Sequence, residues 1–289
     1  KQGSSALTFE KKGEEWSIKD RGGFPVQGER VRSLMRKLAQ AELVERRTRN
    51  PEKFKVLELE DPAGKDAKSR WLAIADDKGK ALAELIVGKR SSEQLGQGKG
   101  GTYVRRPGEN ETWLVSGEID VSTAVNQWVD TSMFEAEIAK VVRVTSEAPG
   151  QDKLQIDREA GKPANKDNYK LLGKPDDKKL KYEYSLEDIV NAFARVEFED
   201  VRKPVAPAAG AATAPVSIAV FESEGGMKIT MRVRSEGDAR WATVSAAADG
   251  DLKAAADKIN AKVSPWEYRL PTWKYEQIFK KPGELWDAG

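Results

Sequence analysis

The sequence contains neither cysteine nor histidine among its 289 residues. Without these side chains the chain cannot provide the ligands of the usual zinc, haem or iron–sulfur sites. Cysteine–histidine and serine–histidine–aspartate catalysis are excluded for the same reason. The absence of cysteine does not define a compartment, because it fits a cytosolic protein and equally an envelope protein without disulfides.

The sequence also lacks a run of roughly 18 apolar residues, so we expect no membrane-spanning helix in it. Its net charge is only +2, because 49 Lys and Arg residues oppose 47 Asp and Glu residues. A nucleic-acid-binding protein would be expected to carry a one-sided basic surface, so we expect no nucleic-acid partner. Eight Trp and eight Phe residues supply large apolar anchors, and we therefore expect a folded core rather than disorder.

Alternation of apolar and polar residues predicts a series of β-hairpins. The first joins residues 7–11 to 15–19 around a turn at Lys12 and Gly13. Further hairpins are expected over residues 70–87, 102–115 and 137–158, and three more strands over residues 216–221, 227–233 and 240–244.

Apolar residues at helical spacing predict a helix over residues 28–43. Its buried face is expected to carry Val31, Leu34, Met35, Leu38 and Ala41. The basic residues on its other faces fit either a ligand-binding surface or an ordinary solvated face. We favour the solvated face, because Glu29 and Glu42 dilute the positive charge. Three further helices are predicted. One begins at Ser185, which is expected to be its N-cap. The second covers residues 251–262, and the third begins near Pro271.

The order of hairpin, amphipathic helix and antiparallel strands occurs twice along the chain. This order predicts an α+β protein of two similar units, each with a helix packed on a mainly antiparallel sheet. We predict the first unit over residues 1–134 and the second over residues 135–289. The second unit contains a Lys-rich polar loop over residues 161–181 and an Ala/Pro-rich segment near 203–215, which is expected to be flexible.

Glycines cluster at Gly96–Gly101, where a phosphate-binding loop is one interpretation. Such a loop would place Lys before Ser or Thr and would open a helix. Here Gly100 follows Lys99, and a strand rather than a helix is predicted after the loop. We therefore favour a flexible segment that leads into the next hairpin.

Adjacent carboxylates occur at Asp76–Asp77 and Asp176–Asp177. Converging acids can perform general acid–base chemistry or bind a metal ion. Both pairs lie beside predicted turns, so we favour turn formation. Asp249 and Asp251 resemble the start of a calcium loop, but the later acidic ligands are missing and helix capping is the favoured role.

Four aromatic residues gather near the C-terminal end of the sequence: Trp266, Tyr268, Trp273 and Tyr275. They could form a platform for a sugar or a peptide, but we favour the interpretation that alternate members complete the core of the second unit. A carboxylate-only glycosidase would require two converging acids about 5–10 Å apart, so a hydrolase is disfavoured but not excluded.

The stretch from Arg47 to Pro62 is dense in charge and contains a helix-start signal. Asn50 is an expected N-cap, and Pro51 is suited to the first helical position. We predict a short helical turn anchored by Phe54 and Leu57, with Leu59 as a further candidate anchor. A strand over residues 54–60 is the alternative.

Several short motifs in a fixed order resemble the bacterial domain-of-unknown-function family 4340. The residues that carry this resemblance are Trp16, Ile18, Val31, Leu34, Leu38, Thr48, Asn50, Pro51, Glu52, Leu59, Asp61, Pro62, Leu85–Lys89, Tyr103–Arg105 and Tyr268–Pro271. They cover most of the chain. The Lys-rich loop and the Ala/Pro-rich segment depart from the pattern.

The resemblance implies an envelope protein at the periplasmic face of the bacterial inner membrane, attached through an N-terminal anchor that is absent from this chain. It also implies an accessory role beside ABC-type transporters of the gliding-motility auxiliary type. We therefore predict a non-enzymatic domain that docks onto transporter subunits or other envelope proteins. The alternative is a lipid- or glycan-binding module that serves the transporter. The family supplies no catalytic, metal-binding or cofactor-binding residues, so we predict no cofactor.

Overall fold

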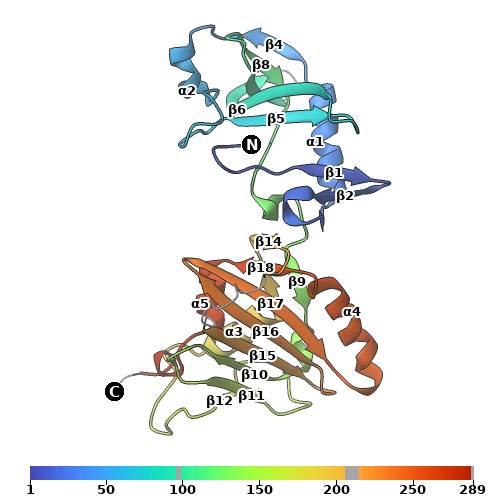
Figure 1. Cartoon of the computed structure of the whole chain (residues 1–289). Coiled ribbons are helices and arrows are strands. Elements are labelled where there is room, and N and C mark those ends of the chain that lie inside the picture. Colours follow the sequence, from blue (N-terminus) through green and yellow to red (C-terminus); the bar gives the residue numbers. More distant parts are fainter. Residues whose placement is uncertain (96–98, 206–214, 288–289) are drawn as a thin grey trace. The chain divides into compact units, whose positions relative to one another are not determined.

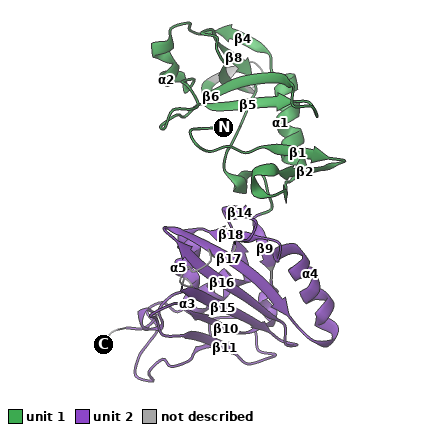
Figure 2. Ribbon diagram, in the orientation of Figure 1, with its two compact units in different colours: residues 1–130 green, residues 131–289 purple. Residues whose placement is uncertain are grey.

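The structure is a computed structural model that describes residues 1–95, 99–205 and 215–287. It is a mixed α+β fold in which strands outnumber the five α-helices of the described residues, and the named strands pair in antiparallel fashion (Figure 1). The chain divides into two compact units, Lys1–Asp130 and Thr131–Gly289 (Figure 2). The boundary between the units follows Asp130, whereas the predicted first unit ended at residue 134. The difference arises because strand β9 (Ser132–Glu135) pairs with β13 (Arg195–Glu197) in unit 2.

Unit 1 contains two antiparallel sheets. The smaller has the order β1-β2-β3 and the larger has the order β4-β8-β7-β6-β5. Their strands are β1 (Phe9–Lys12), β2 (Glu15–Ile18), β3 (Phe24–Pro25), β4 (Leu43–Arg46), β5 (Arg70–Ala75), β6 (Ala81–Leu95), β7 (Lys99–Arg105) and β8 (Thr112–Ser116). The three hairpins predicted in this half of the sequence are thus confirmed.

Helix α1 (Gly28–Gln40) buries Val31 and Leu34, as predicted, and Leu38 is half-buried. The prediction was wrong for Met35, which is 38% exposed. It ends earlier than predicted, and Leu43 begins strand β4 instead. On its exposed side Glu29 accepts hydrogen bonds from Arg32 at 3.0 Å and Arg36 at 2.6 Å. These pairs neutralise part of the positive charge on the helix surface, which fits the favoured solvated face.

The charged corner after β4 forms a helical start, as predicted. The side chain of Asn50 accepts a hydrogen bond from the backbone N–H of Glu52 at 3.0 Å, and Pro51 opens a short 3₁₀ turn. Helix α2 (Phe54–Leu57) follows, so the alternative strand over residues 54–60 is wrong. Phe54 and Leu59 are buried in the core of unit 1.

Unit 2 is built on an eight-stranded antiparallel sheet of order β12-β11-β10-β15-β16-β17-β18-β14. Its strands are β10 (Val141–Glu147), β11 (Leu154–Arg158), β12 (Tyr169–Leu171), β14 (Asp200–Arg202), β15 (Val216–Ser223), β16 (Lys228–Glu236), β17 (Ala239–Ala247) and β18 (Glu267–Leu270). The helices are α3 (Ser185–Ala194), α4 (Lys253–Val263) and α5 (Thr272–Ile278). Ser185 is not the predicted N-cap, because it is already helical and its hydroxyl donates to the carbonyl of Tyr182.

Burial alternates along the central strands, so the two faces of this sheet differ. One face carries buried side chains such as Phe221, Met231 and Val244. Helices α3 and α5 lie behind the sheet in Figure 1, and the Tyr275 hydroxyl of α5 lies 2.9 Å from that of Ser217 on the covered face. The opposite face carries half-exposed or exposed residues, which we call the open face: Val216, Ile218, Val220, Thr230, Arg232 and Thr243.

Two predictions fall partly on undescribed sequence. The glycine cluster at 96–101 includes residues 96–98, and the Ala/Pro-rich segment near 203–215 includes residues 206–214, all outside the described residues. None of the helices within residues 1–95, 99–205 and 215–287 has the length and apolarity needed to cross a membrane. The similarity predicted between the two units stays a prediction.

Candidate functional site

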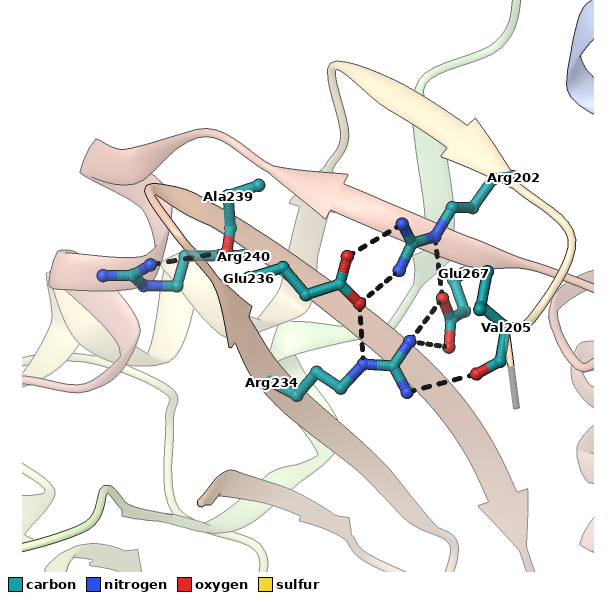
Figure 3. Close-up of polar contacts among 7 residues, drawn as sticks. All are labelled: Arg202, Val205, Arg234, Glu236, Ala239, Arg240 and Glu267. Carbon is teal, nitrogen blue, oxygen red and sulfur yellow. Dashed lines mark hydrogen bonds and ion pairs between the residues drawn. The ribbon is translucent and has the colours of Figure 1, made fainter. Parts of the chain in front are cut away.

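Four charged residues form a closed ring of ion pairs at one end of the eight-stranded sheet (Figure 3). Arg202 comes from β14, Arg234 and Glu236 from β16, and Glu267 from β18. The strand order brings them together, because Arg202 pairs in register with Glu267. Arg234 and Glu236 are two residues apart on one strand, so their side chains lie on the same face. We call these four residues the ion-pair ring.

Each arginine of the ring contacts both glutamates. Arg202 donates to Glu236 at 2.9 and 2.6 Å and to Glu267 at 2.9 Å. Arg234 donates to Glu267 at 2.9 and 3.0 Å and to Glu236 at 3.0 Å. The pair from Arg202 to Glu236 uses both terminal nitrogens of the planar guanidinium fork, which matches the geometry of a carboxylate. A single terminal nitrogen of Arg234 contacts both oxygens of Glu267. The ring therefore joins β14, β16 and β18 across the intervening strand β17.

Aromatic rings lie against two cationic groups here, Arg202 of the ion-pair ring and the adjacent Lys203. The guanidinium carbon of Arg202 lies 3.8 Å from the centre of the Trp241 ring, and the ammonium nitrogen of Lys203 lies 3.4 Å from that of Trp266. Both distances are within the range of cation–π attraction. Trp241 is directly opposite Arg234 in the β16–β17 register. The indole ring and the ion-pair ring therefore lie on the same face of the sheet.

Burial separates the two glutamates of the ring. The side chain of Glu267 is only 4% exposed, whereas that of Glu236 is 40% exposed. The hydrogen bonds from Arg202 hold the pKa of Glu236 below its ordinary value. Burial opposes this lowering, and the hydrogen bond from Arg234 adds to it. A general acid at neutral pH would need a raised pKa instead. The lowered pKa therefore argues against Glu236 as a general acid, and the contacts of the ring fix the three strands and present charge at the surface.

The adjacent carboxylates predicted as turn residues lie in turns. Asp76 accepts hydrogen bonds from the backbone N–H groups of Lys78 at 3.0 Å and Lys80 at 2.8 Å, which closes the β5–β6 turn. Asp176 and Asp177 lie in a turn closed by the N–H of Lys178 and the carbonyl of Pro175. Both pairs thus have the turn role that was favoured.

Asp249 takes the N-cap position of a short 3₁₀ turn before α4, but its side chain makes no capping hydrogen bond there. The favoured capping role of Asp249 and Asp251 is therefore not realised through a side chain, since α4 also begins without one. In the described part of the chain no group of three or more Asp and Glu residues could hold a metal ion.

The aromatic cluster near the C-terminal end divides between core and surface. Trp266 and Tyr268 are buried, and Tyr268 packs against Phe198 with ring centres 4.8 Å apart. Tyr275 is half-buried, whereas Trp273 is 57% exposed. Burial of the first two members confirms that the cluster closes the core of unit 2.

A small cavity of about 270 Å³ lies between α4 and the neighbouring end of the sheet. Its lining residues are Gly226, Lys228, Ala246, Ala247, Ala248, Asp249, Lys253, Ala256 and Asp257. The Lys253 ammonium is already paired with Asp257 at 2.6 Å. The cavity is lined by small alanine and glycine residues together with charged side chains, whereas typical ligand pockets have mostly apolar walls.

Sequence reasoning missed the ion-pair ring completely. Its members are distributed over residues 202–267 and share no motif. Strand β14, which supplies Arg202, has only three residues and was not predicted. The only available signal was the spacing of Arg234 and Glu236 within a predicted strand region, which does not identify a partner.

The comparisons with known proteins gave one match. A model of the family described as "Domain of unknown function (DUF4340)" matches residues 16–215. No curated protein and no solved structure matches the chain. The match spans all of unit 1 from β2 onward and continues into unit 2 as far as the start of β15.

Proposed function

The chain belongs to the DUF4340 family, and from this membership we propose that it is a non-enzymatic accessory domain of the cell envelope. In this proposal the domain lies at the periplasmic face of the inner membrane. It acts by docking onto subunits of an ABC-type transporter or of an envelope-maintenance complex. The observation that supports docking most directly is the open face of the sheet in unit 2.

Protein–protein contact fits the composition of the open face. Val216, Ile218 and Val220 occupy alternate positions on β15, so their side chains form an aliphatic row. Thr230 and Arg232 on the neighbouring strand supply polar groups along that row. Aliphatic groups bordered by polar and arginine side chains are typical of interfaces that form between independently folded proteins.

The ion-pair ring supports the same proposal from the adjoining part of the sheet. It joins strands β14, β16 and β18 through charge-assisted hydrogen bonds. Arg232 lies two residues before Arg234 on β16 and therefore points to the same face. A docking surface on a rigid sheet loses little conformational entropy when a partner binds.

The alternative function, a lipid- or glycan-binding module, would need an apolar groove or an exposed row of aromatic rings. In the aromatic cluster near the C-terminal end Trp266 and Tyr268 are buried, so the exposed Trp273 forms no row with them, and Arg202 covers the ring of Trp241. The small cavity beside α4 is lined partly by charged residues. We therefore retain docking as the proposed function.

The absence of cysteine from the chain allows a direct test by site-specific crosslinking. Single cysteines at Arg232 and Ser245, both exposed on the open-face side of the sheet, would carry a photoreactive crosslinker. The matched control is a cysteine at Val56, which is 65% exposed in unit 1. The protein should be expressed in its own cells from its complete gene.

We expect mass spectrometry to identify a transporter subunit, or another named envelope protein, crosslinked to positions 232 and 245 but not to position 56. Equal crosslinking at all three positions would contradict docking through the open face. The absence of any envelope protein from all crosslinked products would contradict the docking function itself.

A further inference from the structure

The Lys-rich segment 161–184 is not explained by the docking proposal. It contains seven lysines and four carboxylates, so its net charge of +3 exceeds the +2 of the whole chain. Most such charge runs are simply solvated. This one has additional features that an ordinary solvated loop would not require.

The first feature is unpaired positive charge. Lys166 lies 2.9 Å from Glu183 and 3.7 Å from Asp167. Within the part of the chain that the structure describes, the other six lysines of this segment pair with no carboxylate. Four of these six are exposed: Lys162, Lys170, Lys179 and Lys181.

The second feature is exposed apolar and aromatic surface within the same segment. Leu172 is 61% exposed, Tyr182 is 75% exposed and Tyr184 is 50% exposed. They are among the most exposed large hydrophobic side chains in the described chain. Tyrosine presents an apolar ring with a polar tip, which suits the boundary between water and lipid.

The fold fixes this segment at the β12 edge of the eight-stranded sheet (Figure 1). On β12 itself Tyr169 and Leu171 are buried, whereas Lys170 is exposed, and the exposed Leu172 follows directly. The alternation places Lys170 and Leu172 on the same side. Near the end of the segment, the backbone N–H of Lys181 donates to the carbonyl of Leu285 at 2.9 Å. This hydrogen bond attaches the second half of the segment to the C-terminal part of the chain.

The two ends of the segment are also tied to each other. The ammonium nitrogen of Lys166, which is paired with Glu183, lies 5.4 Å from the centre of the Tyr184 ring. The hydroxyl of Ser185 donates to the carbonyl of Tyr182 at 2.8 Å. The exposed tyrosines therefore project from a braced turn at the start of α3.

We propose that segment 161–184 is a peripheral contact site for a bilayer surface containing anionic phospholipids. The unpaired lysines would lie against the phosphate groups, while Leu172 and the two tyrosines would enter the headgroup boundary. Basic residues and interfacial side chains together are what binding to an anionic membrane requires. An acidic protein surface would use the lysines but would not specifically require insertion of Leu172 and Tyr182. This inference concerns a different surface from the open face and does not rest on the docking proposal.

The test is sedimentation of the chain with sucrose-loaded vesicles. One set contains phosphatidylglycerol and phosphatidylethanolamine, and the other contains only zwitterionic phosphatidylcholine. We expect binding to the first set alone, weakened by added salt because salt screens surface charge. The triple variant K170Q/K179Q/K181Q should lower the partition coefficient by about tenfold to a hundredfold, since each lysine near an anionic surface contributes roughly fivefold. Its control is K12Q/K65Q/K78Q, which removes the same charge from exposed lysines in unit 1 and should bind like the unaltered chain.

A second variant separates insertion from simple charge attraction. L172N/Y182S retains every lysine, and we expect it to lose several-fold in vesicle binding while retaining its circular dichroism spectrum. Binding that is indifferent to lipid charge, or equal loss in the two triple-lysine variants, would overturn the proposal. So would competition of vesicle binding by millimolar glycerol phosphate, because it would indicate a soluble phosphate site. Loss of a crosslinked protein partner in K170Q/K179Q/K181Q without loss of vesicle binding would assign the segment to a protein and also overturn it.

Discussion

At the residue scale, the clearest constraint in unit 1 is the close approach of β6 to the corner that follows α2. A Cβ atom added to Gly88 would lie 2.3 Å from the carbonyl oxygen of Leu57 and 2.9 Å from Cδ2 of Leu59. Glu58 between them has a positive φ of 56°, and Arg105 donates to the Leu59 carbonyl at 2.6 Å. The corner is therefore held from several sides and cannot move away easily.

We expect Gly88→Ala to lower the free energy of unfolding of unit 1 by about 3 kcal/mol, because the added methyl group overlaps backbone atoms. Urea unfolding followed by tryptophan fluorescence would measure the change. Gly283→Ala is the control, since nothing lies within 4 Å of the Cβ position there. Equal stability of the two variants would show that the corner can shift to accept the methyl group.

At the scale of elements, the ion-pair ring links strands that are not all neighbours in the sheet. Strand β14 is the outermost strand, and β17 and β18 separate it from β16. The ring adds side-chain contacts from Arg202 on this edge to Glu236 on β16. It thereby secures a three-residue edge strand whose own backbone pairing with β18 is short.

We expect Glu267→Gln to lower the free energy of unfolding of unit 2 by about 3 kcal/mol, because it leaves two arginines without their buried partner charge. Glu236→Gln is the matched control, since Glu236 bonds the same arginines but is far more exposed. Its cost should be no more than about 1 kcal/mol. Chemical unfolding of both variants provides the measurement, and a larger loss for Glu236→Gln would contradict the assigned importance of burial.

At the scale of the whole molecule, the two units have separate sheets. The five-stranded and three-stranded sheets lie entirely within Lys1–Asp130, and the eight-stranded sheet lies entirely within Thr131–Gly289. Each unit also has its own buried residues, such as Leu114 in the first and Val244 in the second. A unit with its own core and complete sheets is expected to fold independently.

We predict that residues 1–130 and residues 131–289, expressed separately, each unfold in a cooperative transition. Circular dichroism during heating would show this directly. Gly88→Ala should shift only the transition of the first fragment, and Glu267→Gln only that of the second. A fragment without a cooperative transition would mean that its fold depends on the rest of the chain.

The sequence by itself determined the local features of this protein. The hairpins followed from alternation, and the start at Asn50 and Pro51 followed from side-chain and backbone chemistry within a few residues. Balanced charge and the lack of cysteine and histidine also restricted the chemistry before any fold was known. The family resemblance was likewise readable in the sequence, and the match over residues 16–215 confirms it.

Only the tertiary structure decided which residues meet. Arg202 and Glu267 are far apart in the sequence, and no local pattern predicts that β14 pairs with β18. The open face likewise depends on which side of the sheet the helices cover, which alternation alone does not specify. Strand order and helix placement come from hydrogen bonding and burial summed over distant segments, whereas propensities and caps act over a few neighbouring residues. This difference in range is why the hairpins were predictable and the ion-pair ring was not.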